Sequence, residues 1–249
     1  MSLPITVSIG AGWSIGPGWA LGSDQAPTVV GTWSFNGAND LQILNNTATY
    51  TGNTTFEMWI RPTGTSTSPV WWMPVDYVSP SNYNKLQWYL NGSTITAQNI
   101  PRAGGASVFT PIATTLNPNA WNYVCFTVAS GVAILYVNGA RIGSSTASNY
   151  TYRLSSWYVG YDTQPTPDEF FTGQLTNIRL SNADIYNLAA LPATMTVPTA
   201  QLTVESSTLV LYTMSNPTAD ISNEIDSTGN ADTIASAPPT WVAANPSPY

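Results

Sequence analysis

The chain has 249 residues, a formal net charge of −7, no histidine, and only 8% charged residues. Without an imidazole it cannot contain a Ser-His-Asp or Cys-His relay, and its single cysteine, Cys125, cannot complete a zinc site or an intramolecular disulfide. Because 43% of the residues are hydrophobic and 12% are aromatic, the sequence predicts a globular chain with a large core.

The distribution of charge argues against nucleic acid and membrane partners. The six Lys and Arg residues stand singly, whereas a phosphate-binding surface needs clustered cations. No stretch approaches 18 uninterrupted apolar residues, so no membrane insertion is predicted. Residues 162–249 hold nine anions and only Arg179 as a cation, which makes this third of the chain the acidic part.

The first 28 residues predict an extended arm and a linker. Residues 8–13 are followed by a close repeat in residues 14–19, and apolar residues alternate with Gly, Ser and Thr throughout. Strict alternation indicates an extended strand, and an uncharged Trp-rich strand has to dock on other protein. The surface on which this arm docks is either the domain of the same chain or a neighbouring subunit. The docking candidates are the large apolar residues Ile9, Trp13, Ile15 and Trp19.

From residue 29 onward, short β-type segments alternate with turn residues. The predicted strands are residues 32–35, 41–44, 55–61, 69–78, 85–90, 94–97, 121–128, 132–137, 140–144, 156–160, 170–180 and 208–214. Asn91-Gly92 and Asn138-Gly139 predict tight hairpins. Only residues 182–190 have helical length and composition, and Pro192 limits them.

This pattern predicts an all-β fold, an antiparallel β-sandwich of the jelly-roll type with at most one short helix. The first and last strands of such a fold often pair. The domain prediction is an N-terminal arm and linker over residues 1–28, a jelly-roll domain over residues 29–234, and a Pro- and Ala-rich tail over residues 235–249.

Several motifs carry a family likeness. Residues 121–127 (WNYVCFT) and 133–139 (AILYVNG) form one pair of motifs, and residues 171–180 (FTGQLTNIRL) form another. In this order they resemble the laminin-G-like, concanavalin-A-like jelly-roll domains, and the likeness covers about residues 30–214. By alternation, Val124 and Phe126 point inward, and we expect Cys125 to be a buried, inert thiol.

The flanks resemble a narrower class. The repeated Ile-Gly-x-Gly units near the N-terminus, and the order of motifs from Phe171 to Asn230, are similar to those of bacteriophage and large-DNA-virus structural proteins. This resemblance implies a place in a virion, with other virion proteins or copies of the chain as partners.

Catalytic carboxylates are not evident. Glycoside hydrolases with this sandwich place paired carboxylates on one strand face, where residues i and i+2 lie together. Here Glu57 stands alone, and the adjacent Asp168 and Glu169 would point to opposite faces of a strand. The sequence therefore predicts a protein that is not an enzyme and needs no cofactor.

A calcium site is one alternative for the acidic third. The resemblance implies it, because laminin-G-like domains often bind calcium through loop carboxylates and carbonyls. Asp162, Asp168 and Glu169 are the candidates, and plain surface carboxylates are the competing interpretation.

Two aromatic groups have the residue types of a glycan platform, where sugar rings stack on Trp or Tyr. The first consists of Trp71, Trp72, Tyr77 and Tyr83. The second lies between residues 150 and 161. A sandwich core or a subunit interface needs the same residues. The leading hypothesis is a non-enzymatic virion structural protein that assembles through its arm. The alternative is a carbohydrate-binding module for attachment to a host glycan.

Overall fold

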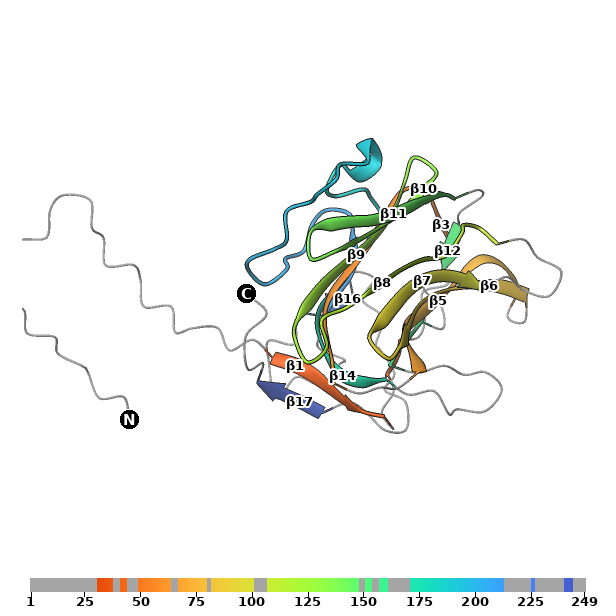
Figure 1. Cartoon of the computed structure of the whole chain (residues 1–249). Coiled ribbons are helices and arrows are strands. Elements are labelled where there is room, and N and C mark those ends of the chain that lie inside the picture. Colours follow the sequence, from red (N-terminus) through yellow and green to blue (C-terminus); the bar gives the residue numbers. More distant parts are fainter. Residues whose placement is uncertain are drawn as a thin grey trace, which may run out of the picture.

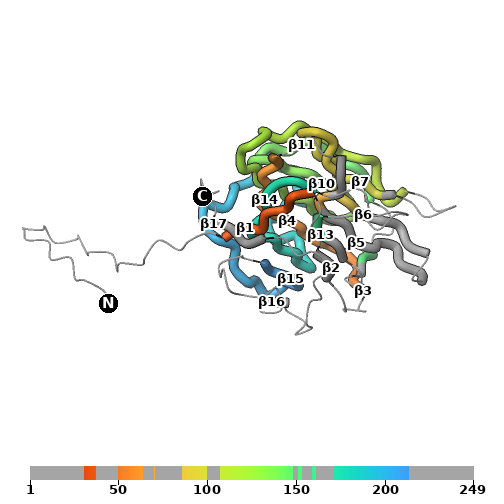
Figure 2. Tube along the Cα trace, turned by 90° about the horizontal axis from the view of Figure 1, so that it is seen from below, coloured from red at the N-terminus to blue at the C-terminus, as the bar shows by residue number. Residues whose placement is uncertain are grey.

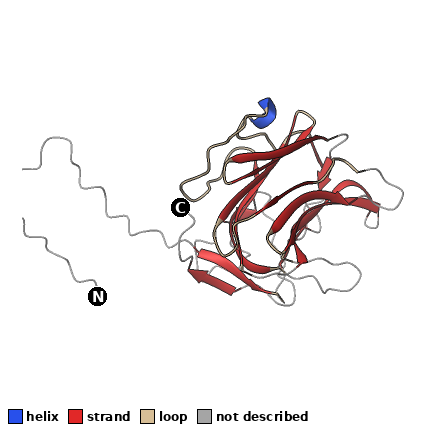
Figure 3. Cartoon of the chain, viewed as in Figure 1, coloured by secondary structure: helices blue, strands red, loops and turns tan. Residues whose placement is uncertain are grey.

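The computed structural model describes residues 31–37, 41–43, 49–63, 67–79, 82–100, 107–147, 151–153, 157–160, 171–212, 225–226 and 240–243. Most of them belong to strands (Figure 3). No helix in these ranges is both long enough and apolar enough to cross a membrane.

Within the described ranges, the larger sheet, sheet A, has nine antiparallel strands. Its main path, from one edge to the other, is β11 (Ala140–Thr146), β10 (Val132–Val137), β9 (Asn122–Ala129), β4 (Thr54–Pro62), β14 (Thr172–Ser181), β1 (Gly31–Asn36) and β17 (Thr240–Ala243). Off this path, β15 (Thr208–Tyr212) pairs with β14, and β16 (Ile225–Asp226) pairs with β15.

Strand β14 is the centre of sheet A. One side of it pairs with β4. On the other side its first half pairs with β1, and its second half pairs with β15. A register shift between Thr176 and Arg179 separates the halves, and Asn177 there has a positive φ of 50°. This bulge lets a single strand serve two different neighbours.

The smaller sheet, sheet B, has eight strands in the described part of the chain. Its main path is β2 (Leu41–Ile43), β13 (Trp157–Val159), β5 (Thr67–Ser79), β6 (Asn82–Asn91), β7 (Thr94–Ile100) and β8 (Ile112–Thr115). Strand β12 (Thr151–Arg153) pairs with β5 and with β3 (Thr49–Thr51).

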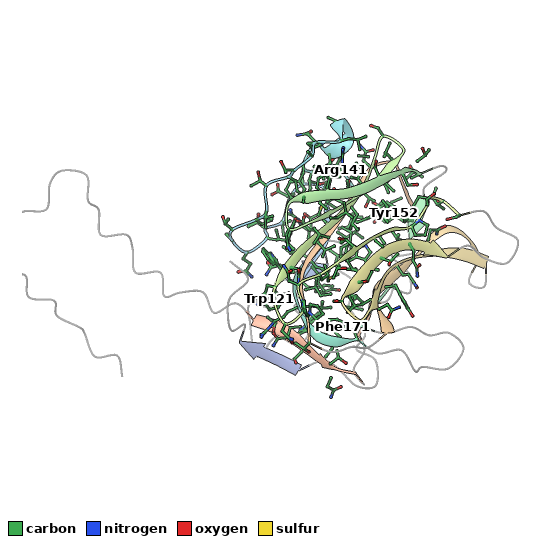
Figure 4. All side chains as sticks on the ribbon, in the orientation of Figure 1. Trp121, Arg141, Tyr152 and Phe171 are labelled. Carbon is green, nitrogen blue, oxygen red and sulfur yellow. The ribbon has the colours of Figure 1, made fainter. Side chains whose placement is uncertain are left out.

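The main core lies between the two sheets (Figure 1). Phe56 of β4 and Trp88 of β6 meet across it with ring centroids 4.5 Å apart. Val124 and Phe126 belong to this core, as the alternation in β9 predicts. Figure 4 shows side chains filling the space between the sheets, with Tyr152 and Phe171 labelled. The predicted antiparallel β-sandwich is therefore confirmed.

A second, smaller apolar cluster lies on the other face of sheet A. It includes Trp59, Tyr123, Cys125, Tyr136 and Leu188. Residues 182–207, which we call the strap, cover this face on the side away from sheet B (Figure 1). Sheet A is therefore buried on both faces, and the burial of every residue of β9 reflects this.

The strap contains the only helix of the described ranges, a single 3-10 turn, η1 (Leu188–Ala190). The prediction of at most one short helix is thus confirmed there, but the element is shorter than the 182–190 segment suggested. Residues Asn187 and Leu191 on either side have φ values of 55°, which ends the helical turn at both ends.

Both predicted hairpins are confirmed, one of them with its turn displaced by one residue. Asn138 and Gly139 both have positive φ, 50° and 82°, as a type I′ turn between β10 and β11 requires. The β6–β7 turn differs by one residue, because β6 includes Asn91 and the two loop residues are Gly92 and Ser93. Gly92 has φ of 59°, and glycine at the first loop position is typical of a type II′ turn.

Five short strands were not predicted from the sequence: β3, β8, β12, β16 and β17. The strand β17 lies inside the segment predicted as a tail and pairs with β1, Trp33 opposite Trp241 (Figures 1 and 2). The first and last described strands thus pair, as expected for this type of sandwich.

Candidate functional site

A buried cluster of charged and phenolic side chains lies between sheet A and the strap. Alternation in β4 turns Phe56 and Met58 into the main core and Glu57 toward the strap. Strand β14 places Arg179 directly opposite Glu57 in the register. Both side chains are almost completely buried.

Every carboxylate oxygen of Glu57 has two donors. Oε1 accepts from Arg179 Nε at 2.7 Å and lies 2.6 Å from Arg179 Nη2. Oε2 accepts from the hydroxyl of Tyr186 at 2.7 Å and also from the hydroxyl of Tyr123. Arg179 Nη2 also donates to the Tyr186 hydroxyl at 3.1 Å. The charge of Glu57 is therefore compensated inside the protein.

The surroundings of this cluster shift several pKa values. Burial, followed by the charges of Cys125 and Glu57, raises the pKa of Tyr123 well above its usual value. Burial and Glu57 raise the pKa of Tyr186 as well. Burial lowers the pKa of Arg179, but the Glu57 carboxylate outweighs this and the net pKa is raised. At neutral pH the phenols are protonated donors and the guanidinium is charged.

Further contacts fix the strap on sheet A. Arg179 Nη1 donates to the carbonyl of Thr203 at 2.8 Å, and the amide of Leu202 donates to Asn177 Oδ1 at 2.9 Å. Within the strap, the carboxylate of Asp184 accepts from the amides of Leu188 and Ala189 at the start of η1. The strap is thus held by hydrogen bonds along its length.

The opposite end of the strap is also anchored. Tyr136 donates its hydroxyl to the carbonyl of Pro192 at 2.8 Å. Arg141, labelled in Figure 4, donates through Nη1 to the carbonyl of Leu191, and its amide donates to Ala193 at 3.0 Å.

Two adjoining cavities remain between the strap and sheet A. Their volumes are about 330 Å³ and 280 Å³. Arg179, Tyr186 and Glu205 line both. Glu205 is half-exposed, with its Oε1 3.8 Å from Arg179 Nη1.

The outer face of sheet B has a different character. The inward residues of β6 and β7, among them Leu86 and Trp88, belong to the main core. Alternation places mostly polar residues on the opposite face: Lys85, Gln87, Tyr89 and Asn91 of β6, and Thr94, Thr96, Gln98 and Ile100 of β7.

Gln87 stands out on this outer face. It is only 2% exposed, and its Oε1 has no hydrogen-bond partner among the described residues. In the register, Gln87 lies opposite Trp72 of β5 and Gln98 of β7.

The structure places only part of the predicted site residues. Ile9, Trp13, Ile15 and Trp19 of the arm lie outside the described residues, as do the calcium candidates Asp162, Asp168 and Glu169. The glycan-platform residues lie in neighbouring strands, with Trp71, Trp72 and Tyr77 in β5 and Tyr83 in β6. The described residues contain no group of three acidic or cysteine side chains that could hold a metal ion.

Two residues of the sequence analysis belong to packed interiors. Tyr152, from the second aromatic group, is a buried core residue that stacks on Tyr50 at 5.3 Å and donates to Asn182 Oδ1. Cys125 is a free, fully buried thiol whose pKa is raised by burial and by Glu57. It is the buried thiol predicted from the sequence.

Comparisons with known proteins agree with this architecture. Residues 35–185, more than half of the chain, match the model of the Laminin G-type family described as the concanavalin A-like lectin/glucanases superfamily. The chain belongs to this superfamily. No curated protein matches the sequence significantly.

Solved structures share the fold at low sequence identity. A candidate carbohydrate-binding protein from Bacteroides ovatus has 14% identity and a TM-score of 0.59, over 87% of this chain and 60% of the other. Domains LG4-5 of the mouse laminin α1 chain have 14% identity and a TM-score of 0.47, over 69% and 45%. A pentraxin from Limulus polyphemus has 14% identity and a TM-score of 0.44, over 63% and 77%. The likeness to the Bacteroides protein shows the shared fold.

The Glu57–Arg179 pair was not recognised in the sequence as a unit. The available signal was a charge flanked by apolar residues in each of two predicted strands, Glu57 between Phe56 and Met58 and Arg179 between Ile178 and Leu180. Isolated charges at such positions are buried only when they are paired.

Proposed function

We propose that this protein is a non-catalytic carbohydrate-binding module that uses the outer face of sheet B. The observation that carries the proposal is the composition of this face. It combines amide and hydroxyl side chains with the aromatic ring of Tyr89, and it includes Gln87, whose Oε1 has no hydrogen-bond partner among the described residues. Carbohydrate sites combine these groups, because sugars present many hydroxyls and apolar ring faces.

The register supports this location. Trp72 and Gln98 occupy the register positions opposite Gln87 on the two neighbouring strands. Membership in a superfamily of lectins and glucanases is consistent with a saccharide ligand.

The absence of catalysis is part of the proposal. Glycosidic hydrolysis needs a carboxylic acid and a second carboxylate free to act on the substrate. Among the carboxylates whose side chains the structure describes, that of Glu57 is saturated by donors, and that of Asp184 accepts from backbone amides of η1. Glu205 lies on the strap, on the other side of the sandwich from sheet B.

Binding is tested on the intact chain with an array of neutral and acidic glycans, followed by calorimetric titration of the best ligand. We expect Trp72→Ala and Gln98→Ala each to weaken binding about tenfold or more, in line with the loss of a stacking or hydrogen-bonding group. The control is Ser144→Ala, an exposed position on the edge strand β11 of the other sheet. An array without binding, or equal affinities in all variants, would contradict the proposal.

A second function is supported by the repeated segment at the N-terminus. We propose that residues 1–22 mediate assembly with copies of the chain or with other virion proteins. The repeat of residues 8–13 in residues 14–19, with its uncharged alternating pattern, supports this role. Deletion of residues 1–22 should reduce the oligomer size measured by light scattering. An unchanged size, or a monomeric full-length chain, would refute assembly through the arm.

A further inference from the structure

The groove formed by the two cavities beside Arg179 has the size of a small ligand site. The cavities, of about 330 Å³ and 280 Å³, share three lining residues. Small-molecule sites in proteins are typically about 300–1,000 Å³. The groove lies on the outer face of sheet A, whereas the proposed carbohydrate face belongs to sheet B.

A donor and an acceptor face each other at this groove. Arg179 donates through Nε and Nη2 to Glu57, through Nη2 to Tyr186, and through one N–H of Nη1 to the Thr203 carbonyl. The remaining N–H of Nη1 has Glu205 Oε1 at 3.8 Å, too far for a hydrogen bond. The Glu205 side chain is 55% exposed, so its carboxylate is open to a ligand.

The charges at the groove favour a neutral ligand. Glu57 already compensates Arg179, so Glu205 leaves one excess negative charge. A carboxylate or phosphate ligand would meet this negative charge. A hydroxyl group can instead donate to Glu205 and accept from Arg179 at the same time. Pro198 and Leu202 add an apolar wall against which a sugar ring can pack.

We propose that the groove between the strap and sheet A is a second saccharide subsite, specific for neutral sugars, with a vicinal diol bridging Glu205 and Arg179. This inference rests on the proposed carbohydrate-binding function. It adds a second binding face, opposite the first, so that one molecule can engage two saccharide chains.

The experiment uses two bulky substitutions in the strap of the full chain. Ala200→Trp fills the groove, because Ala200 lines it and is exposed. Val204→Trp is the matched control, because Val204 is 51% exposed and lies outside the residues that line either cavity. Glu205→Gln tests the acceptor without changing the shape of the side chain. Binding of the glycan selected on the array is followed by calorimetry and by hydrogen exchange with mass spectrometry.

We expect two sites per chain by calorimetry and slower exchange of amides in residues 196–207 when the glycan is bound. Ala200→Trp should remove one site, Glu205→Gln should weaken that site about tenfold, and Val204→Trp should change neither. One site, with slower exchange confined to β6 and β7, overturns the subsite and leaves the proposed function intact. No glycan binding at all overturns both.

Discussion

The strongest structural prediction concerns Glu57, the acceptor at the centre of the cluster beneath the strap. Glu57→Gln keeps the size of the side chain but removes its charge and replaces one acceptor oxygen by an NH₂ donor. Four donor contacts, two from Arg179 and one each from Tyr123 and Tyr186, then share a single acceptor oxygen. The Arg179 guanidinium stays buried, and its remaining counter-charge among the described residues is the half-exposed Glu205 carboxylate, 3.8 Å away.

Removing one partner of a buried ion pair costs about 3–5 kcal/mol. A typical domain is stable by about 5–15 kcal/mol, so the loss is a large part of the total. The assay is urea unfolding followed by the fluorescence of the ten tryptophans. The matched variant Glu205→Gln should cost less than about 1 kcal/mol, since its pair with Arg179 is half-exposed and 3.8 Å long. Equal losses of unfolding free energy in the two variants would refute the conclusion that the buried Glu57 stabilises the fold more than the half-exposed Glu205 does.

Two further stability predictions follow from the same structure. Because the pKa of Tyr186 is raised in the folded protein, its contribution to the free energy of unfolding is fully present below about pH 10, the usual pKa of a phenol. This contribution is lost as the pH rises further, because the phenol then ionises in the unfolded chain but not in the folded protein. Tyr186→Phe should therefore reduce the alkaline slope of the unfolding free energy by up to about 1.4 kcal/mol per pH unit in urea titrations between pH 9 and pH 11, and an unchanged slope would contradict the assignment. Gly173→Ala should destabilise far more than Gly52→Ala, because a Cβ at Gly173 would lie 2.6 Å from the Arg61 carbonyl oxygen, whereas nothing lies within 4 Å at Gly52. Both glycines have positive φ, so similar melting temperatures for the two variants would show that this contact is unimportant.

Much of the sandwich could be predicted because alternation and turn residues are local signals. In the segments around Phe56, Phe126 and Leu135, apolar residues recur with a period of two, and the segments end at turns. This pattern predicts both that the segment is a strand and which of its side chains face the core. The short strands β3, β12 and β16 have only two or three residues each, too few to show a period. Their pairing depends on long-range partners.

The strap is the clearest case in which local patterns are insufficient. Residues 182–190 have helical composition, yet only Leu188–Ala190 form a helical turn. The strap instead follows the outer face of sheet A, where Asn177 and Arg179 bind its backbone. These contacts join residues that lie 24–25 positions apart in the sequence. Tertiary hydrogen bonds thus override the weak helical propensity of this segment.

The pairing of Glu57 with Arg179 at the candidate site likewise could not be predicted from local sequence patterns. Each strand was predicted, and the alternation in β4 correctly separates Glu57 from Phe56. The pairing of the two charges depends on the register between β4 and β14, which includes a bulge at residues 176–179. A bulge cannot be located from the period of a strand, and it changes which side chains meet.

The most direct test of the central proposal is to locate a bound glycan on the intact protein. Hydrogen exchange with the best glycan of the array should show slower exchange in β6 and β7, around Gln87 and Gln98, and Trp72→Ala should reduce this effect at the same glycan concentration. A glycan that binds but leaves these strands unaffected, or an array without any ligand, would contradict the proposal that the outer face of sheet B binds carbohydrate.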